Sequence, residues 1–235
     1  MFEIIEHIVD MNTNLIVPIT LGVDKKSHEP IHIDLAKCGS ILLAGATKQG
    51  KSHCIHDMIS QIEHLASPPR VIIFDPKRCE FSNYKDRYQI IETLHDAKTV
   101  LFTELFEGEI CKRSLSAGQD HSPIIIVIDE LLDLIFMHNS KSKQHFDDRL
   151  RYEVIIKLLT IGPGLNIFSI IATQSLDKNI LTREILDICK TRIAFRTINS
   201  QDSKRIIKKA GAENLLGRGD IILYQEGSCQ MVRCH

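Results

Sequence analysis

Eight consecutive residues constrain the fold of this chain more than any other feature of its sequence. They read Gly45-Ala-Thr-Lys-Gln-Gly50-Lys51-Ser52 and match the pattern G-x-x-x-x-G-K-[ST] in full. The apolar run Ser40–Ala44 precedes them and the helical pattern Lys51–His64 follows, which is the strand–loop–helix order that this motif requires. The two glycines allow the backbone to wrap a phosphate with its N–H groups, and the start of the helix adds the positive end of its dipole. The sequence therefore predicts a site for a nucleotide phosphate.

The side chains of this loop have expected roles in binding ATP and Mg²⁺. Lys51 is expected to reach the β- and γ-phosphates, and Ser52 to hold the metal ion. The predicted nucleotide-binding residues are Gly45, Ala46, Thr47, Lys48, Gln49, Gly50, Lys51, Ser52 and His53. The competing interpretation is a turn rich in glycine and lysine with an unrelated role, and the strand before it and the helix after it count against that interpretation.

A second apolar run ends in two carboxylates. Ile124–Ile128 is followed directly by Asp129 and Glu130, and ligands of α/β proteins bind at the carboxyl ends of the strands. Asp129 is expected to hold the water shell of Mg²⁺, and Glu130 to polarise the water that attacks the γ-phosphate. An acidic pair after a strand is by itself more often a helix N-terminal feature. Beside a phosphate loop the catalytic interpretation is preferred. Glu130 also argues against a kinase, because a general base that activates water is needed by a hydrolase.

Gln174 follows a third apolar run, Asn166–Ala172, after Thr173. At the tip of a buried strand, the Gln174 amide would lie beside the γ-phosphate. There it could form a hydrogen bond with the phosphate or with the attacking water and so transmit the loss of the phosphate to the rest of the fold. The alternative is a glutamine that only caps the strand. The residue alone does not decide between the two.

The apolar and amphipathic segments alternate along the chain. The predicted buried strands are Ser40–Ala44, Arg70–Phe74, Pro123–Ile128 and Asn166–Ala172. The predicted helices are Lys51–His64, Leu94–Leu115, Asp147–Leu159 and Ser200–Lys209. This alternation indicates an α/β fold, with a mainly parallel sheet flanked by helices. Ile221–Tyr224 and Gln230–Val232, joined by a turn at Glu226–Ser228, predict a C-terminal antiparallel hairpin at the sheet edge.

Composition excludes several classes of protein. The 235 residues include 29 Lys and Arg and 30 Asp and Glu, which argues against a simple polycation that coats nucleic acid but leaves a localised basic surface open. No apolar run has the length needed to span a bilayer, and the N-terminus does not read as a secretory signal. The seven cysteines are scattered and odd in number, which is typical of reduced thiols in a cytoplasmic protein. Without a repeat or a Pro-rich linker, residues 1–235 are predicted to form one domain, with residues 1–39 as short strands leading into the core.

The order of these motifs resembles the FtsK/SpoIIIE family of DNA-translocating ATPases. After the phosphate loop, the matching segments are Val71-Ile-Ile-Phe-Asp75-Pro76-Lys77-Arg78, Val127-Ile-Asp-Glu-Leu-Leu-Asp-Leu134, Ala172-Thr-Gln174, Lys190-Thr-Arg192-Ile-Ala-Phe195, Asp202-Ser203 and Gly211-Ala-Glu-Asn-Leu-Leu-Gly217-Arg-Gly219-Asp220. Ile19–Gly22 and Ile33–Ala36 look like the family's short strands before the nucleotide site. The resemblance implies a RecA-like motor core that assembles as a homo-oligomeric ring, commonly a hexamer. ATP would then lie between subunits, with double-stranded DNA in the pore.

The sequence departs from the family pattern at one catalytic position. Family members usually carry an arginine eleven residues before the glutamine, where it reaches the ATP of the neighbouring subunit. Pro163 occupies that position here, and Arg151, Arg183 and Arg192 are the candidate replacements. An arginine finger is worth about 10³–10⁵ in rate, so turnover without a replacement is expected to be slow. Ser175 also replaces an arginine that often follows the glutamine.

Charge is distributed unevenly along the chain. Residues 178–218 carry ten Lys and Arg against four acidic residues, whereas the whole chain has a net charge of −1. Such asymmetry is typical of a surface that binds DNA phosphates without sequence preference. The candidate contacts are Lys178, Arg205, Lys208 and Lys209, and the competing interpretation is a solvated helix face. Residues 138–145 are predicted to be either a pore loop or a surface loop.

Two functional hypotheses remain. The first is an ATP-driven DNA motor, short enough to suit a plasmid or other mobile element in transfer, replication or packaging, with a protein partner from that process. The second is an ATP-gated assembly or coupling protein with weak hydrolysis that binds a protein partner. Pro163 is the main support for the second hypothesis.

Overall fold

The computed structural model describes residues 17–116, 121–135, 144–217 and 219–234. Within these residues the strands form one mixed sheet of ten, in the order β2-β1-β10-β9-β8-β3-β7-β6-β4-β5. The strands are β1 Pro18–Asp24, β2 Pro30–Asp34, β3 Ser40–Ala44, β4 Arg70–Phe74, β5 Gln89–Ile91, β6 Ile124–Ile128, β7 Ile167–Thr173, β8 Thr191–Ala194, β9 Asp220–Gln225 and β10 Ser228–Arg233.

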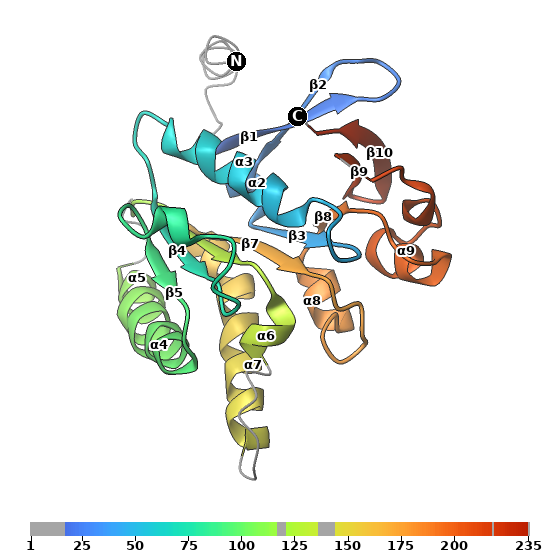
Figure 1. Cartoon of the computed structure of the whole chain (residues 1–235). Helices are drawn as coiled ribbons and strands as arrows, with labels where there is room; N and C mark the ends of the chain where they lie inside the picture. Colours follow the sequence, from blue (N-terminus) through green and yellow to red (C-terminus); the bar gives the residue numbers. More distant parts are fainter. Residues whose placement is uncertain (1–16, 117–120, 136–143, 218, 235) are drawn as a thin grey trace.

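The helices cover both faces of this sheet (Figure 1). The α-helices are α2 Leu35–Cys38, α3 Lys51–Glu63, α4 Leu94–Thr99, α5 Lys112–Leu115, α6 Leu131–Ile135, α7 Gln144–Ile161, α8 Arg183–Ile188 and α9 Ser200–Ile207. A π-helix, η2 (Val100–Cys111), joins α4 to α5, and short 3₁₀ turns lie at Ser82–Tyr84 (η1), Gly162–Leu165 (η3) and Ala212–Asn214 (η4). The predicted segment Leu94–Leu115 is therefore helical throughout. No helix within the described residues is long and apolar enough to cross a membrane.

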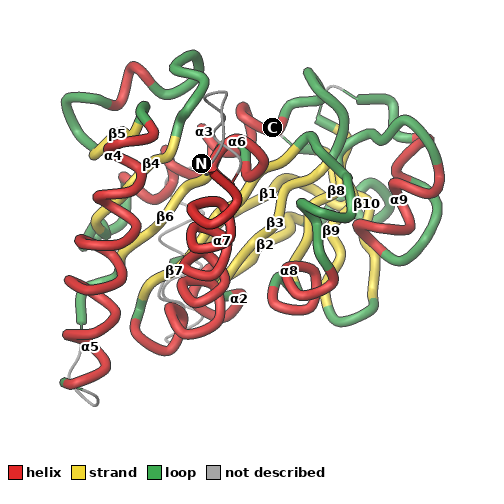
Figure 2. The backbone as a smooth tube through the Cα atoms, turned by 90° about the horizontal axis from the view of Figure 1, so that it is seen from below, coloured by secondary structure: helices red, strands yellow, loops and turns green. Residues whose placement is uncertain are grey.

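The parallel half of the sheet is the centre of the molecule. β8, β3, β7, β6, β4 and β5 run parallel, and every residue of β3, β6 and β7 is buried. These strands lack polar alternation because helices cover both of their faces. One apolar cluster lies between the sheet and α3, and a larger one lies under η2, α6, α7, α8 and α9. Figure 2 shows the strands and the helices along this face of the sheet from below. The predicted α/β class is confirmed.

The C-terminal hairpin forms as predicted but lies inside the sheet. β9 and β10 pair antiparallel through the two-residue turn Glu226–Gly227, in which both residues have positive φ, as hairpin turns of this length require. The prediction of an edge position is wrong, because β10 also pairs with β1 and β9 pairs with β8. The long-range pairing of β1 with β10 leaves β2 and β5 as the edge strands.

The N-terminal strands differ in one detail from the prediction. β2 ends at Asp34, and Leu35 begins helix α2, so the predicted strand Ile33–Ala36 is half helix. The reason is local: the Asp34 carboxylate accepts a hydrogen bond from the backbone N–H of Ala36 at 3.0 Å and caps the helix.

Candidate nucleotide site

The phosphate loop connects the carboxyl end of β3 to the first turn of α3. Gly45 has a φ of +155°, and a Cβ there would lie 2.7 Å from the Cβ atom of Phe195, so only glycine fits between the loop and the end of β8. Gly50 caps α3 in the left-handed region, with a φ of +104°. The loop therefore has the backbone that a phosphate cradle requires, and α3 begins directly beneath it.

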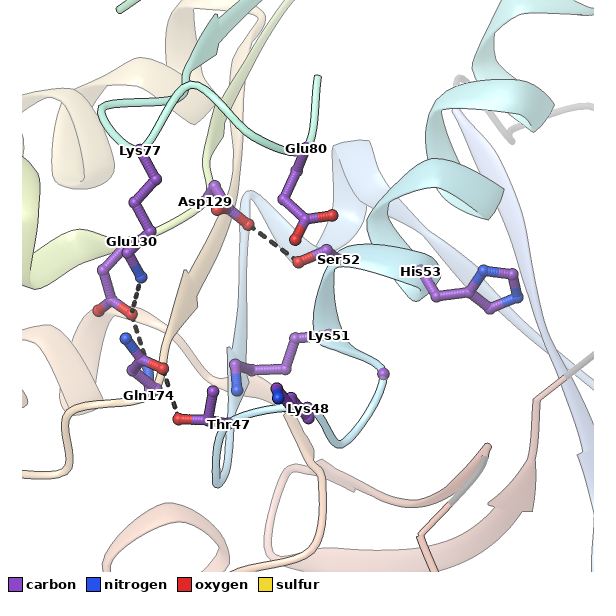
Figure 3. A pocket seen from close by; sticks show the side chains of 11 residues that line it. Thr47, Lys48, Lys51, Ser52, His53, Lys77, Glu80, Asp129, Glu130 and Gln174 are labelled. Carbon is purple, nitrogen blue, oxygen red and sulfur yellow. Dashed lines mark hydrogen bonds and ion pairs between the residues drawn. The ribbon is translucent and has the colours of Figure 1, made fainter. Parts of the chain in front are cut away.

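The loop opens into a pocket of about 500 Å³ at the carboxyl edge of the sheet (Figure 3). Its lining residues come from the loop and from the ends of β4, β6 and β7: Thr47, Lys48, Gly50, Lys51, Ser52, His53, Lys77, Glu80, Asp129, Glu130 and Gln174. The structure thus brings together all five residues predicted to carry hydrolysis. Gly45, Ala46 and Gln49 belong to the loop but do not line the pocket.

Lys51 is folded back onto its own loop. Its Nζ atom donates to the carbonyl oxygens of Gly45 and Ala46, both at 2.8 Å, and the residue is only 9% exposed. Burial lowers the pKa of this ammonium to about 8, although the negative charges of Glu130 and Asp129 act to raise it. Lys51 is therefore still mainly protonated at neutral pH, in a position next to the space that a phosphate would fill.

Ser52 and Asp129 form a pair suited to a magnesium ion. The Ser52 hydroxyl donates to the Asp129 Oδ1 atom at 3.3 Å, across the pocket wall. Burial, and then the charge of Asp75, raises the pKa of Asp129 to about 6. A hydroxyl and a carboxylate are the hard oxygen donors that Mg²⁺ takes alongside water and phosphate oxygens. A cation there would stabilise the charged carboxylate that burial disfavours, so the residues fit this metal.

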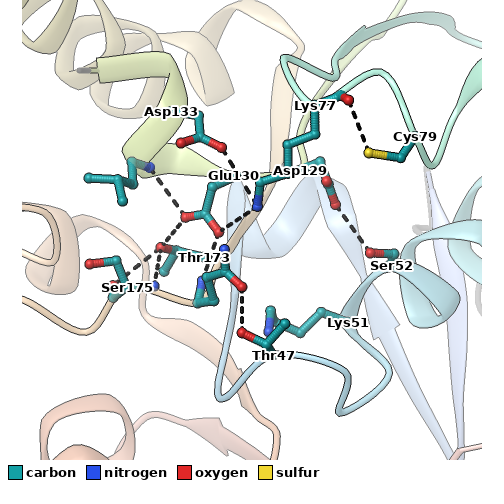
Figure 4. A network of polar contacts seen from close by, with 12 residues as sticks. Thr47, Lys51, Ser52, Lys77, Cys79, Asp129, Glu130, Asp133, Thr173 and Ser175 are labelled. Carbon is teal, nitrogen blue, oxygen red and sulfur yellow. Dashed lines mark hydrogen bonds and ion pairs between the residues drawn. The ribbon is translucent and has the colours of Figure 1, made fainter. Parts of the chain in front are cut away.

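Glu130 is held by several donors at the end of β6 (Figure 4). Its Oε1 atom accepts from the Thr173 hydroxyl at 2.7 Å and from the backbone N–H of Leu132 at 3.4 Å. Its Oε2 atom accepts from the backbone N–H of Gln174 at 3.1 Å and lies 3.5 Å from the Nζ atom of Lys77. With 2% exposure, Glu130 is fixed in orientation at the pocket wall.

Gln174 links β7 to the phosphate loop. Its Oε1 atom accepts a hydrogen bond of 2.6 Å from the Thr47 hydroxyl. This places the amide across the mouth of the loop, as Figure 3 shows. The Gln174 amide is thus in contact with the predicted phosphate loop.

Sequence reasoning did not assign Lys77 and Glu80 to the site. Both follow β4, which pairs with β6 in the sheet and so brings them beside Asp129. Lys77 also lies 3.6 Å from the Asp133 Oδ2 atom. The available signal was the segment Asp75-Pro76-Lys77 after a buried strand, but its proximity to the acidic pair depends on the order of strands, which is a long-range property.

Two of the three candidate arginine fingers are unsuited to that role. Arg151 is 2% exposed and donates twice to the Ile135 carbonyl oxygen. Arg192 is 3% exposed and caps the ends of α8 and α9 through three carbonyl oxygens, those of Leu186, Cys189 and Ile206. Neither side chain is accessible to a neighbouring molecule.

Arg183 remains as the exposed candidate, since its side chain is 96% exposed at the start of α8. Pro163 itself lies in η3 and packs beside Gly39. A Cβ atom added to Gly39 would lie 2.8 Å from the Pro163 ring. That position precedes β7, at the opposite end of the strand from Gln174.

The predicted DNA contacts do not all lie at the same edge of the sheet. Lys178 is exposed in the loop after β7, on the side of the phosphate loop, and Lys209 is exposed after α9. Lys208 lines a cavity of about 430 Å³ beside the amino end of β8, so it lies at the opposite edge from Lys178. Arg205 is half-buried and donates to the Leu181 carbonyl oxygen at 3.1 Å. Residues 138–143 of the predicted pore loop lie outside the described residues.

Comparison with known proteins identifies related sequences. The model of the FtsK/SpoIIIE family matches residues 9–103. The DNA translocase FtsK of Haemophilus influenzae is 28% identical over 93% of this chain and 48% of its own length. The DNA translocase SftA of Bacillus subtilis is 31% identical over 92% of this chain and 24% of its own length. The chain thus spans about half or less of these curated relatives.

Solved structures share the fold at lower identity. The pCW3 conjugation coupling protein TcpA, in a monomer form with ATPγS, superposes with a TM-score of 0.82 at 21% identity, over 93% of this chain and 65% of that one. The genome packaging NTPase B204 of Sulfolobus turreted icosahedral virus 2 gives a TM-score of 0.57 at 17% identity, over 84% and 97%. The fold is thus that of RecA-like P-loop ATPases. The family model, the translocase relatives and the motif order around the pocket support an FtsK/SpoIIIE-family ATPase motor domain in this chain.

Proposed function

We propose that this chain hydrolyses ATP and uses the energy to move DNA, with double-stranded DNA as the favoured track. The observation that carries the proposal is the meeting of Lys51, the Ser52–Asp129 pair, Glu130 and Gln174 around one pocket. A site built only to bind nucleotide needs no carboxylate oriented beside the γ-phosphate position. The curated relatives are DNA translocases, which supports DNA as the partner coupled to hydrolysis.

The residues divide the work of hydrolysis among them. Lys51 exchanges the Gly45 and Ala46 carbonyl oxygens for the β- and γ-phosphates of ATP. Ser52 and Asp129 hold Mg²⁺, which supplies charge neutralisation at the phosphates when bound. Glu130 orients the attacking water and accepts its proton. Gln174 moves from Thr47 to the γ-phosphate and transmits the loss of that phosphate to β7.

The ATP site is proposed to be completed by a second copy of the chain in a ring, with six copies as the expected number. Two exposed apolar side chains flank the phosphate loop: Ile198 at 83% and Leu216 at 74% exposure. Residues next to both side chains contact the phosphate loop. Arg196, two residues before Ile198, accepts a hydrogen bond from the Ala46 N–H through its carbonyl oxygen, and Gly217, which follows Leu216, lies against the Gln49 side chain. Apolar side chains beside a polar ligand site are typical of a surface covered in an assembly. We assign the motor to a plasmid or other mobile element, in transfer, replication or packaging.

Steady-state ATP hydrolysis with and without DNA tests the proposal. Duplex DNA at low salt is expected to raise the rate at least tenfold, and Lys51→Ala to abolish it. Lys85→Ala is the matched control, because Lys85 is a surface lysine paired with Glu92 and does not line the pocket. The stimulation is expected to fall steeply as salt rises, since phosphate contacts release counterions. Absence of both DNA binding and rate change at low salt would contradict the proposal.

A second candidate is an ATP-gated assembly protein with weak hydrolysis. Its support is Pro163 in place of the arginine, together with the burial of Arg151 and Arg192. Such a protein would bind a protein partner only with ATP, and this binding would survive Glu130→Gln. A motor would lose its DNA-stimulated turnover in the same variant.

A further inference from the structure

Three hydrogen bonds and one ion pair surround the carboxylate of Glu130. Two ionised oxygens offer about four acceptor positions. The Thr173 hydroxyl and the Leu132 N–H donate to Oε1 and the Gln174 N–H donates to Oε2, while the Lys77 ammonium lies 3.5 Å from Oε2 as an ion pair beside the remaining position. A general base must have a free lone pair within hydrogen-bond reach of the proton that it abstracts. The Lys77 ammonium therefore has to move before the remaining position on Oε2 can accept from a water molecule.

Three of these donors are fixed by the fold. Two are backbone N–H groups, of Leu132 and Gln174, and the third is the hydroxyl of Thr173, a residue with 0% exposure at the end of β7. They orient the carboxylate without any help from Lys77. Removal of the Lys77 contact therefore leaves the orientation of Glu130 intact.

Lys77 is the donor that can leave. Its side chain is 36% exposed and lines the pocket, and its Nζ atom lies 3.6 Å from Asp133 as well as 3.5 Å from Glu130. Asp133 lies on α6, and its side chain is also 36% exposed. The ammonium can thus release Glu130 and keep a carboxylate partner, at the small cost that a half-exposed ion pair carries.

We propose that Lys77 is a positioning residue that blocks the Oε2 atom of Glu130 until the site is ready for hydrolysis, with Asp133 as its alternative partner. The proposal rests on the function proposed above, because it assumes that Glu130 is the base. A γ-phosphate in the pocket adds negative charge beside the ammonium and draws it away from Glu130. The Oε2 atom then becomes available to the attacking water.

The test compares DNA-free ATP hydrolysis by the full chain and by Lys77→Met, which keeps the length of the side chain but removes its charge. We expect kcat to rise at least threefold while KM for ATP stays within twofold. Lys77→Gln is the second variant, used if Lys77→Met melts at a lower temperature than the native chain. Lys85→Met is the matched control and is expected to leave kcat unchanged, since it removes a surface ion pair with Glu92 whose residues do not line the pocket.

A double variant separates this proposal from the function that it rests on. If Lys77 acts through Glu130, the gain in kcat disappears when Glu130→Gln is also present. A fall or no change in kcat for both Lys77 variants, with Glu130→Gln inactive, overturns the blocking role and leaves the proposed function intact. Full activity of Glu130→Gln alone instead overturns the function assigned to Glu130. A gain that persists in the double variant shows that Lys77 acts on the nucleotide directly and also overturns the proposal.

Discussion

Asp129→Asn is expected to stabilise the nucleotide-free protein at neutral pH and to remove its response to magnesium. The Asp129 carboxyl is 7% exposed, and burial, followed by the charge of Asp75, raises its pKa from 3.8 to about 6. A folded-state pKa above the unfolded value means that the folded protein binds the proton more tightly. Stability is therefore lost as the pH rises from about 4 to about 6. The difference of about two pH units corresponds to about 3 kcal/mol above pH 6.

The asparagine variant does not titrate, and its amide oxygen can still accept from Ser52. Its free energy of unfolding at pH 7.5 should therefore exceed that of the native chain by about 1–3 kcal/mol, and the gain should vanish near pH 4. Magnesium should stabilise only the native chain, by about 2.7 kcal/mol at a concentration one hundred times its Kd.

Urea unfolding at pH 4 and pH 7.5, with EDTA and then with MgCl₂, measures both effects. Asp187→Asn is the control, because its side chain is 64% exposed, and a change within about 0.5 kcal/mol is expected. The reasoning is refuted if Asp129→Asn is no more stable than the native chain at pH 7.5 in EDTA, or if magnesium stabilises both equally.

Three further substitutions test other parts of the structure. Arg192→Met removes the donors from three helix-end carbonyl oxygens and should lower the free energy of unfolding by about 3 kcal/mol in urea titrations, whereas the exposed Arg183→Met should leave it unchanged. Thr173→Val removes the 2.7 Å hydrogen bond to Glu130 and should lower kcat about tenfold with little change in ATP affinity, measured by steady-state kinetics. Gly45→Ala places a Cβ 2.7 Å from a side-chain carbon and should weaken binding of a fluorescent ATP analogue more than tenfold, with the melting temperature as a control for folding.

The strands that the sequence predicts best are those buried on both faces. β3 and β4 have the predicted bounds, because an uninterrupted apolar run has only one placement in a covered parallel sheet. β8 was not predicted as a strand, since Thr191 and Arg192 interrupt its apolar pattern. The buried Arg192 is acceptable there because carbonyl oxygens at the ends of α8 and α9 accept from its guanidinium. The partner in α9, Ile206, is 14 residues away along the chain, so the local apolar pattern does not reveal it.

The site shows the same division between local and long-range information. The phosphate loop, Asp129 and Glu130 were found because each is encoded by a short segment whose chemistry can be read directly. The contact of Lys77 with Glu130 depends on β4 lying beside β6, and this neighbourhood is set by the crossover of the chain between them. Lys77 is visible in the sequence, but no local pattern there indicates that it lies beside the Glu130 carboxylate.

The polar groups at the centre of the pocket pair with one another. Lys51 donates to the carbonyl oxygens of its loop, Gln174 accepts from Thr47, and Glu130 accepts from Thr173 and from the Gln174 N–H. In the proposed function ATP would exchange these contacts for new ones, so its affinity would reflect only the difference between the two sets.

In the proposed motor, the same exchange would couple ATP to movement. Gln174 directly follows β7 and Glu130 lies two residues after β6, so each change of partner would act close to the end of a central strand. Fully buried strands such as these can transmit a displacement, because a close-packed protein interior is hardly compressible. A pocket whose polar groups had no partners in the protein would bind ATP more tightly. It would, however, change fewer of its own contacts on binding and would transmit a smaller displacement to the sheet.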